Sequence, residues 1–279
     1  MESVVEGRAR HRRENDRLNV QHEAVKALMG GNLVRAPIGL DKPEIRVLDS
    51  GTAQANWLLD LVQCTQPTAH LVGTDIAPEQ FPEESTLPPH ISLHKQSIFD
   101  PWPSNWQSSF DLVHQRFVLA ACGSLEQGQE AVAQLANLAK PGGWVEIHEG
   151  NMMVIQEGPE HKAMMRFRDL AVGVWKSLGK MPDPGVNVVQ WLQKAGLHNV
   201  KEEVQTLKIG AAASDPVQGE DALYLCLNMF DAIQRMAAGK KDYPGEAELS
   251  ALRSELETEL RQVGNEWRYY LAFGQRPGC

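Results

Sequence analysis

The sequence RVLDSGTAQANWLLDL at residues 46–61 decides the fold. An apolar strand ends at Asp49, Gly51 follows in a tight turn, and an apolar helix begins a few residues later. Ligands of open parallel sheets bind beyond the carboxyl ends of the strands, where the following helix offers free N–H groups. Small residues at positions 51, 53 and 55 let the backbone approach such a ligand closely. The stretch therefore predicts a nucleotide-binding turn.

A second acidic residue, Asp75, ends the next predicted strand. A carboxylate at this place can accept two charge-assisted hydrogen bonds from the hydroxyls of a ribose. The turn itself is not a phosphate cradle, because Ala53 and Ala55 stand where a dinucleotide fold has glycine. The GK[ST] signature of a P-loop is also absent. The two aspartates predict a ligand that carries a nucleoside.

Strands and helices alternate through the first half of the chain. The predicted strands span 45–49, 70–75, 91–96, 110–114 and 144–149, and the predicted helices span 2–30, 55–64 and 125–139. The proline-rich segment 76–90 is predicted to be a loop, because proline is unfavourable inside a helix. Strands interleaved with helices indicate an α/β fold with a mostly parallel sheet that is covered on both faces.

The last third is richer in helical patterns. Helices are predicted at 158–179, 186–196, 220–238 and 246–263, and strands at 200–208 and 266–274. In the last helix an apolar stripe recurs every three or four residues, at Leu249, Leu252, Leu256, Leu260 and Val263. Segments 150–180 and 210–240 are not needed to complete a sheet, so we expect a helical lid there. The expected divisions are an N-terminal helical cap (1–44), a ligand-binding core (45–150), and lid helices with the completion of the sheet (151–279).

Composition limits the partners. The 27 Lys and Arg against 36 Asp and Glu give a net charge of −9, which argues against nonspecific nucleic-acid binding. No signal-peptide core and no apolar run near the roughly 18 residues of a membrane span is present. Four scattered cysteines without a CxxC pair favour a reducing compartment. The histidines show no HxxH or HExxH spacing, so no metal site is predicted. We expect a cytoplasmic monomer or homodimer that binds a small molecule, without nucleic acid or membrane.

Four motifs, taken together, resemble the class I S-adenosylmethionine-dependent methyltransferases. They are DSGTA at 49–53, GTDIAP at 73–78, FDLVHQR at 110–116 and KPGGWVEIHE at 140–149. The opening ENDRLNVQH at 14–22 resembles the fungal secondary-metabolism enzymes, the group that includes the LaeA-like proteins. The resemblance implies a seven-stranded, Rossmann-like sheet, with S-adenosylmethionine as cofactor and S-adenosylhomocysteine as product. At positions 53 and 55 the family usually has glycine, and each added methyl group narrows the turn.

The resemblance also implies which positions bind the cofactor. The methionine half would contact the first turn, at Asp49, Ser50, Gly51 and Thr52. The nucleoside would contact the next two strand ends, with Asp75 on the ribose and Ile76, Ser97 and Ile98 around the adenine. Three residues after the fourth strand would lie near the sulfonium and the substrate, namely His114, Gln115 and Arg116. Arg17 and Gln21 on the N-terminal helix would close over the cofactor.

Proton transfer has three candidate residues, which are His148, Glu149 and His114. An unperturbed histidine titrates near neutrality and can take a proton from a nucleophile. His148 could equally be a strand residue whose hydrogen bonds are satisfied by the backbone. Methyl transfer from a sulfonium is an in-line displacement in which the protein supplies alignment and excludes water, so a strong base is optional.

Three functions are compatible with these features. The first is methylation of an oxygen, nitrogen or sulfur atom of a small secondary metabolite. The second is a ring-forming reaction, by a cyclase or pericyclase with the methyltransferase fold that uses the cofactor non-reactively. The third is a non-catalytic, regulatory methyltransferase-like protein. The motif series favours the first.

Overall fold

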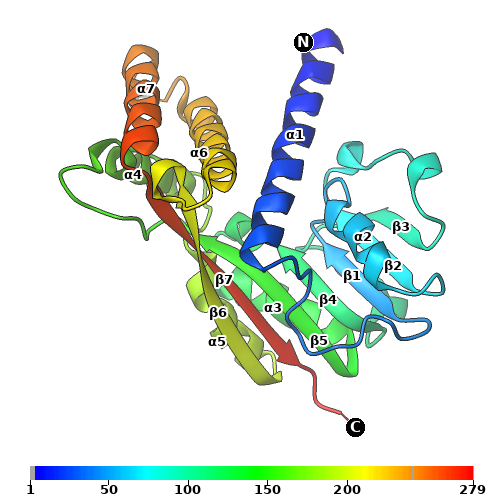
Figure 1. Cartoon of the computed structure of the whole chain (residues 1–279). Helices are drawn as coiled ribbons and strands as arrows, with labels where there is room; N and C mark the ends of the chain where they lie inside the picture. Colours follow the sequence, from blue (N-terminus) through cyan, green and yellow to red (C-terminus); the bar gives the residue numbers. More distant parts are fainter. Residues whose placement is uncertain (1–3, 241, 279) are drawn as a thin grey trace.

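A single seven-stranded sheet runs through the molecule in the order β3-β2-β1-β4-β5-β7-β6 (Figure 1). The computed structural model describes residues 4–240 and 242–278, with side chains from residue 14 onward. Six strands are parallel, and β7 is antiparallel to both of its neighbours. The strands are β1 (Arg46–Ser50), β2 (His70–Asp75), β3 (Ile91–Lys95), β4 (Phe110–Arg116), β5 (Ala139–Asn151), β6 (His198–Ile209) and β7 (Asn265–Gln275). The predicted fold class is confirmed.

Helices cover both faces of this sheet. Val47 and Leu48 are successive residues of β1 that point to opposite faces, and both are completely buried, as parallel strands inside a layered fold require. Side chains of α1 and α2 pack on the Val47 face, and side chains of α3 and α5 pack on the Leu48 face. The helices are α1 (Val4–Leu28), α2 (Asn56–Leu61), α3 (Leu125–Leu138), α4 (Lys162–Ser177), α5 (Val188–Lys194), α6 (Pro216–Ala237) and α7 (Glu246–Gln262).

Most predicted elements are found within a few residues of their expected bounds, and three differ for identifiable reasons. Strand β5 begins at Ala139 instead of 144, because KPGG bends the strand at an irregularity and does not precede it. Helix α2 ends at Leu61, and residues 62–64 continue as a 3₁₀ turn. Val263 follows the last turn of α7 and is exposed, whereas the four leucines of the predicted stripe are buried.

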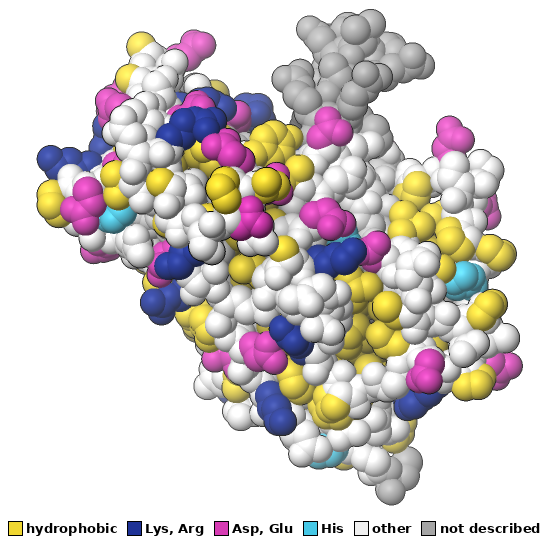
Figure 2. All heavy atoms as spheres, in the orientation of Figure 1, with side chains coloured by type: hydrophobic (Ala, Val, Ile, Leu, Met, Phe, Trp, Pro, Cys, Tyr) yellow, Lys and Arg dark blue, Asp and Glu magenta, His cyan; other side chains and the backbone are white. Residues whose placement is uncertain are grey.

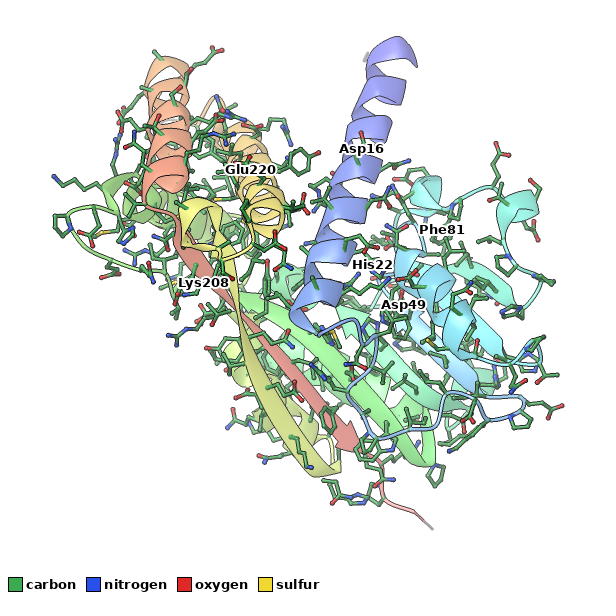
Figure 3. All side chains as sticks on the ribbon, in the orientation of Figure 1. Asp16, His22, Asp49, Phe81, Lys208 and Glu220 are labelled. Carbon is green, nitrogen blue, oxygen red and sulfur yellow. The ribbon has the colours of Figure 1, made fainter. Side chains whose placement is uncertain are left out.

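The connection after β2 contains no α-helix. Residues 76–90 form a loop with two short 3₁₀ turns, Pro78–Gln80 and Glu84–Thr86. This matches the prediction from the prolines of the segment. The loop lies beside the carboxyl ends of β2 and β3, and Phe81 is labelled within it in Figure 3.

The lid helices α4, α6 and α7 form a core of their own above one end of the sheet. Phe167 of α4, Phe230 of α6 and Leu256 of α7 are buried in it together with Trp267 of β7. β7 therefore belongs to the sheet and also contributes Trp267 to the core of the lid, which attaches the lid to the sheet. In Figure 1 the lid and the long helix α1 both extend above the same end of the sheet, with the lid helices to the left of α1.

The first turn of α4 is capped from another helix. The carboxylate of Glu259 on α7 accepts hydrogen bonds from the backbone N–H groups of Ala163 (2.7 Å) and Met164 (2.9 Å). Because helix N-termini leave such donors unsatisfied, we expect Glu259→Ala to lower the free energy of unfolding by about 1–2 kcal/mol. Urea unfolding measures the change. Thr258→Ala, at the exposed neighbouring position, is the control and should change it by less than about 0.5 kcal/mol; equal losses in both variants would contradict the capping role.

The structure describes three of the four cysteines. Cys64, Cys122 and Cys226 are free, and Cys279 lies outside the described residues. Within the described part of the chain, no helix combines the length and the apolar composition that crossing a bilayer demands.

Candidate active site at the carboxyl ends of the strands

The principal cavity, of about 470 Å³, opens at the carboxyl ends of β1, β2, β4 and β5. Helix α1 borders it on one side, with Arg17 and Gln21, and the lid borders it on the other, with Trp175 and Met229. A smaller cavity of about 60 Å³ adjoins it beneath α1 and includes Asp49 and His114. Figure 3 labels Asp49 in the core below α1 and His22 on the helix itself. Gly51, Ala53 and Arg116 line both cavities, so the two form one site.

The turn after β1 is shaped by left-handed backbone. Gly51 has φ +79°, and a Cβ atom there would lie 2.3 Å from Val118 Cγ2, so only glycine fits. Ala53 (φ +48°) and Ala55 (φ +61°) are also left-handed. These are the two positions at which the resembled family usually has glycine, and the structure supplies the reason. The turn is held by N–H groups of residues 51 and 52, which both donate to Thr74 O at 2.8 Å.

Ala53→Gly should stabilise the protein. The Cβ atom of a left-handed residue costs about 1–2 kcal/mol, and the extra freedom of glycine in the unfolded chain costs about 0.5–1 kcal/mol. We expect a net gain of about 0.5–1 kcal/mol in the free energy of unfolding, measured with urea. Ala251→Gly, on the exposed face of α7, is the matched control and should lose about 1 kcal/mol. A loss at position 53 as large as that at 251 would contradict the strained turn.

Asp75 ends β2 and faces the principal cavity. Its Oδ2 accepts the N–H of Ala53 and its Oδ1 accepts the N–H of Ala77, both at 2.9 Å. Each carboxylate oxygen keeps a further lone pair for a ligand hydroxyl. Beside it, Ile76 is 64% exposed, and Phe99 is also exposed. Both line the cavity, as do Ser97 and Ile98. The side chains of Ile76, Ile98 and Phe99 form an apolar surface suited to a purine.

Arg116 places a positive charge between the two cavities. One guanidinium nitrogen contacts Nδ1 of His22 at 3.1 Å, and His22 Nε2 lies 3.2 Å from Asp60. Among the described residues, no carboxylate forms an ion pair with Arg116, although Asp49 attracts it through space. Burial lowers the pKa of Arg116, and it lowers that of His22, whose ring also faces the cationic Arg116. An unpaired cation in this position is suited to an anionic ligand group.

Neighbouring strand residues divide between the two faces of the sheet. Asp49 and His114 form one pair, with His114 Nδ1 2.7 Å from Asp49 Oδ1. The next residues, Ser50 and Gln115, hydrogen-bond to each other at 2.9 Å on the opposite face and line neither cavity. Thr52 lines the small cavity, and its buried hydroxyl has no partner among the described groups. The structure thus brings together all the sequence-predicted cofactor residues except Ser50 and Gln115.

His148 lies in a buried polar network below the site. Its Nε2 is 3.2 Å from Oε1 of Glu146, whose Oε2 accepts the N–H groups of Arg35 (2.8 Å) and Ala36 (2.6 Å). Burial lowers the pKa of His148 to about 4, and the residue lines neither cavity. His148, Glu146 and His114 bring three possible metal-ligating atoms within 4.8 Å of one another. Motif spacing did not predict this cluster, because it forms only when β4 and β5 pair.

Glu149 is the predicted catalytic residue that lines the principal cavity. Its Oε1 accepts the N–H groups of Val118 (2.8 Å) and Leu119 (2.6 Å), immediately after β4. Burial raises the pKa of Glu149 to about 8, against the lowering effect of these N–H groups and that of Gly150. A carboxyl group in this state can exchange a proton with a ligand near neutral pH.

The lid side of the cavity is mostly apolar and was not predicted from the sequence. Its residues come from the end of β5, from β7, from two lid helices and from the positions just after β4 and β5. They are Phe117, Met152, Trp175, Met229, Trp267 and Tyr269, with Asn151 and Arg268 as polar members. Phe117 holds a left-handed φ of +59°, and its ring lies 5.1 Å from that of Tyr269. Figure 2 shows hydrophobic side chains gathered between α6 and α1, and elsewhere on this face charges of both signs are interspersed. The apolar wall is suited to a largely uncharged organic molecule.

Comparison with known proteins gives consistent matches. Residues 21–202 match a family model described as a methyltransferase domain. The chain is 58% identical over 279 residues to the N-methyltransferase tcpN of Claviceps purpurea, covering 99% of both chains. It is 38% identical over 270 residues to the N-methyltransferase gliN of Aspergillus fumigatus, covering 95% and 94%. Among solved structures, the YcgJ protein of Bacillus subtilis shares the fold, with a TM-score of 0.53, 14% identity, and coverage of 93% of this chain and 100% of that one.

Proposed function

We propose, from the premise that this chain belongs to the methyltransferase-domain family and uses S-adenosylmethionine, that it methylates a nitrogen atom of a small secondary metabolite. The observation that carries the choice of nitrogen is the 58% identity, over 99% of both chains, to a relative named as an N-methyltransferase. A second such relative matches over 95% of the chain. The two alternatives, a cyclase or pericyclase and a regulatory protein, are not favoured.

The cavity fits S-adenosylmethionine group by group. Asp75 would hold the ribose hydroxyls, and Ile76 with Phe99 would pack against the adenine. Arg116 would bind the methionine carboxylate, because it is a partly buried cation that forms no ion pair with a carboxylate in the part of the chain that the structure describes. The left-handed turn at Gly51 leaves the close backbone approach that such a ligand requires. When bound, this cofactor supplies an electrophilic methyl group on a sulfonium.

The remaining predicted cofactor contacts differ in the support that the geometry lends them. Arg17, Gln21, Ser97 and Ile98 line the principal cavity, and Asp49, Thr52 and His114 line the small one. Ser50 and Gln115 are bonded to each other on the far face, and we propose that they support the turn without touching the ligand.

The chain's own residues perform three tasks in the proposed reaction. The aromatic wall, including Trp175 and Trp267, orients the acceptor and excludes water from the methyl group's path. Glu149 in its ionised form would accept the proton of the acceptor nitrogen. Val118 and Leu119 hold this carboxylate in place through their N–H groups. His148 is not proposed as a base because it lines neither cavity, and His114 is not because it lines the small cavity and not the principal one.

Partners and location follow the same reasoning. We propose that the protein acts in the cytoplasm on a small molecule, as a monomer or homodimer, with no nucleic-acid or membrane partner. Its acidic net charge of −9 and its free thiols support this assignment.

The decisive experiment separates cofactor binding from acceptor chemistry. Calorimetric titration of the full chain with S-adenosylmethionine and S-adenosylhomocysteine should show micromolar binding that Asp75→Ala weakens at least tenfold, about 1.4 kcal/mol. Acceptor panels with matched N–H, O–H and S–H compounds, incubated with methyl-labelled cofactor, should label the N–H members alone. Labelling confined to oxygen or sulfur would overturn the proposed acceptor, and failure of both titrations would overturn the proposed cofactor site.

A further inference from the structure

Asp49 is a nearly buried carboxylate, only 4% exposed, at the small cavity. Among the described side chains, the one that hydrogen-bonds to it is His114, with Nδ1 2.7 Å from Oδ1. A buried carboxylate without a hydrogen-bond partner is costly, and His114 supplies that partner for Asp49. His114 and Asp49 are directly paired in register between β4 and β1, which fixes their separation.

Two aromatic rings pack against the imidazole of His114. Trp57 of α2 stacks on it with a ring separation of 3.8 Å and an interplanar angle of 5°. His148 meets it edge-on, with ring centroids 5.4 Å apart. The ring is 1% exposed, and its Nε2 has no partner among the described groups. This packing fixes the direction in which Nδ1–H points, as the positioning partner of a functional carboxylate must be fixed.

The small cavity carries one negative and one positive group. Asp49 and Arg116 both line it, and Asp49 attracts the Arg116 guanidinium. The cavity is therefore complementary to a zwitterion, with an ammonium group at Asp49 and a carboxylate at Arg116.

We infer that His114 is a positioning residue, which orients the Asp49 carboxylate so that Asp49 binds the α-ammonium group of the cofactor's methionine half. The inference rests on the proposed cofactor site, and it assigns to His114 a role in affinity and not in proton transfer. It also explains why a histidine stands in the buried row Asp49–His114–Glu146, which crosses three adjacent strands.

Two variants separate the hydrogen bond from the packing. His114→Phe keeps an aromatic ring against Trp57 but removes the donor. His114→Asn removes the ring but keeps an amide N–H close to the position of Nδ1. If His114→Phe does not fold by thermal melting, His114→Gln replaces it, because the glutamine amide reaches the position of Nε2 and leaves Asp49 without its donor.

The test is calorimetric titration of the full chain with S-adenosylmethionine and with an analogue in which hydrogen replaces the α-ammonium group. We expect His114→Phe to weaken S-adenosylmethionine binding at least tenfold and to leave binding of the analogue within twofold of wild type. For His114→Asn, the affinity for each ligand should stay within threefold of wild type. An equal loss for both ligands, or no loss for S-adenosylmethionine, would overturn the inference while leaving the cofactor site intact. Absence of binding by the wild-type protein would instead overturn the proposed function on which the inference rests.

Discussion

Arg116→Met should weaken S-adenosylmethionine binding by about 30- to 100-fold, equivalent to about 2–3 kcal/mol. The variant removes the cation that would bind the methionine carboxylate and replaces it with a side chain of similar length. Arg116 forms no ion pair with a described carboxylate, although Asp49 attracts it through space, so its removal breaks no direct ion pair. We therefore expect the ligand-free variant to melt within a few degrees of wild type while the cofactor-induced rise in melting temperature is lost. Calorimetry and thermal melting with and without cofactor measure both.

The matched control is Arg46→Met. Arg46 begins β1 and lies over the ring of Phe110, 4.9 Å from the guanidinium carbon to the ring centroid. It lies at the opposite end of the strand from the site, so cofactor affinity should stay within twofold of wild type. Arg116→Lys should fall between Arg116→Met and wild type, because an ammonium keeps the charge but loses the planar fork of donors. Unchanged affinity in Arg116→Met would contradict the assignment.

Glu149→Gln should lower kcat by about 10²–10⁴-fold and leave cofactor affinity within twofold of wild type. Glutamine keeps the oxygen that accepts the N–H groups of Val118 and Leu119, so the loop after β4 is preserved. Only the capacity to take a proton is removed. Steady-state kinetics with an acceptor identified in the panel measure kcat, and calorimetry measures the affinity for the cofactor. Glu202→Gln, on the exposed part of β6, is the control and should leave both unchanged.

The pH dependence of the same residue has a definite sign. Burial raises the pKa of Glu149 to about 8, so the ionised base accumulates as pH rises, and wild-type kcat/KM should rise up to about pH 8 and then level off. The free energy of unfolding changes in the opposite direction. Between pH 4.5 and about pH 8 the folded state keeps a proton on Glu149 that the unfolded chain has already released. The contribution from this group is fully present below the ordinary pKa of 4.5 and is lost as pH rises through about 8. Glu149→Gln should remove both dependences, and a variant that retained the kinetic profile would contradict the role of Glu149.

The fold was predictable because the pattern of each parallel strand is local. Buried runs such as VL in β1 and LV in β4 are bounded by turn residues, and glycine marks the left-handed turn at position 51. The alternation of side chains along a strand was the information left unused. His148 and Glu149 point to opposite faces, as do Asp49 and Ser50, and in each of these two pairs one residue lines a cavity and the other does not.

The lid side of the site could not be predicted in the same way. Trp175 and Met229 lie on different helices, and each falls within an ordinary amphipathic pattern that serves the lid core equally well. Their convergence depends on how α4 and α6 pack against β7, which is a tertiary property. The unpaired state of Arg116 is likewise visible only once α1 and the sheet are in place. Sequence pattern singled out residues that line the two cavities at the strand ends, whereas the lid side of the principal cavity required the structure.

The strand shared by the lid and the sheet limits how acceptor preference can be transferred between related enzymes. Trp267 and Tyr269 line the acceptor wall, yet they lie on β7, which pairs Gly150 with Tyr269 and Asn151 with Arg268 in the sheet. A chimera that exchanges residues 152–264 alone would place Trp175 and Met229 of one enzyme beside the β7 residues of another. A working graft must extend through Gln275 and therefore carry the sheet pairing with it. A change of substrate range that depends on this wall therefore involves β7 as well as the lid helices. The lid cannot be exchanged on its own.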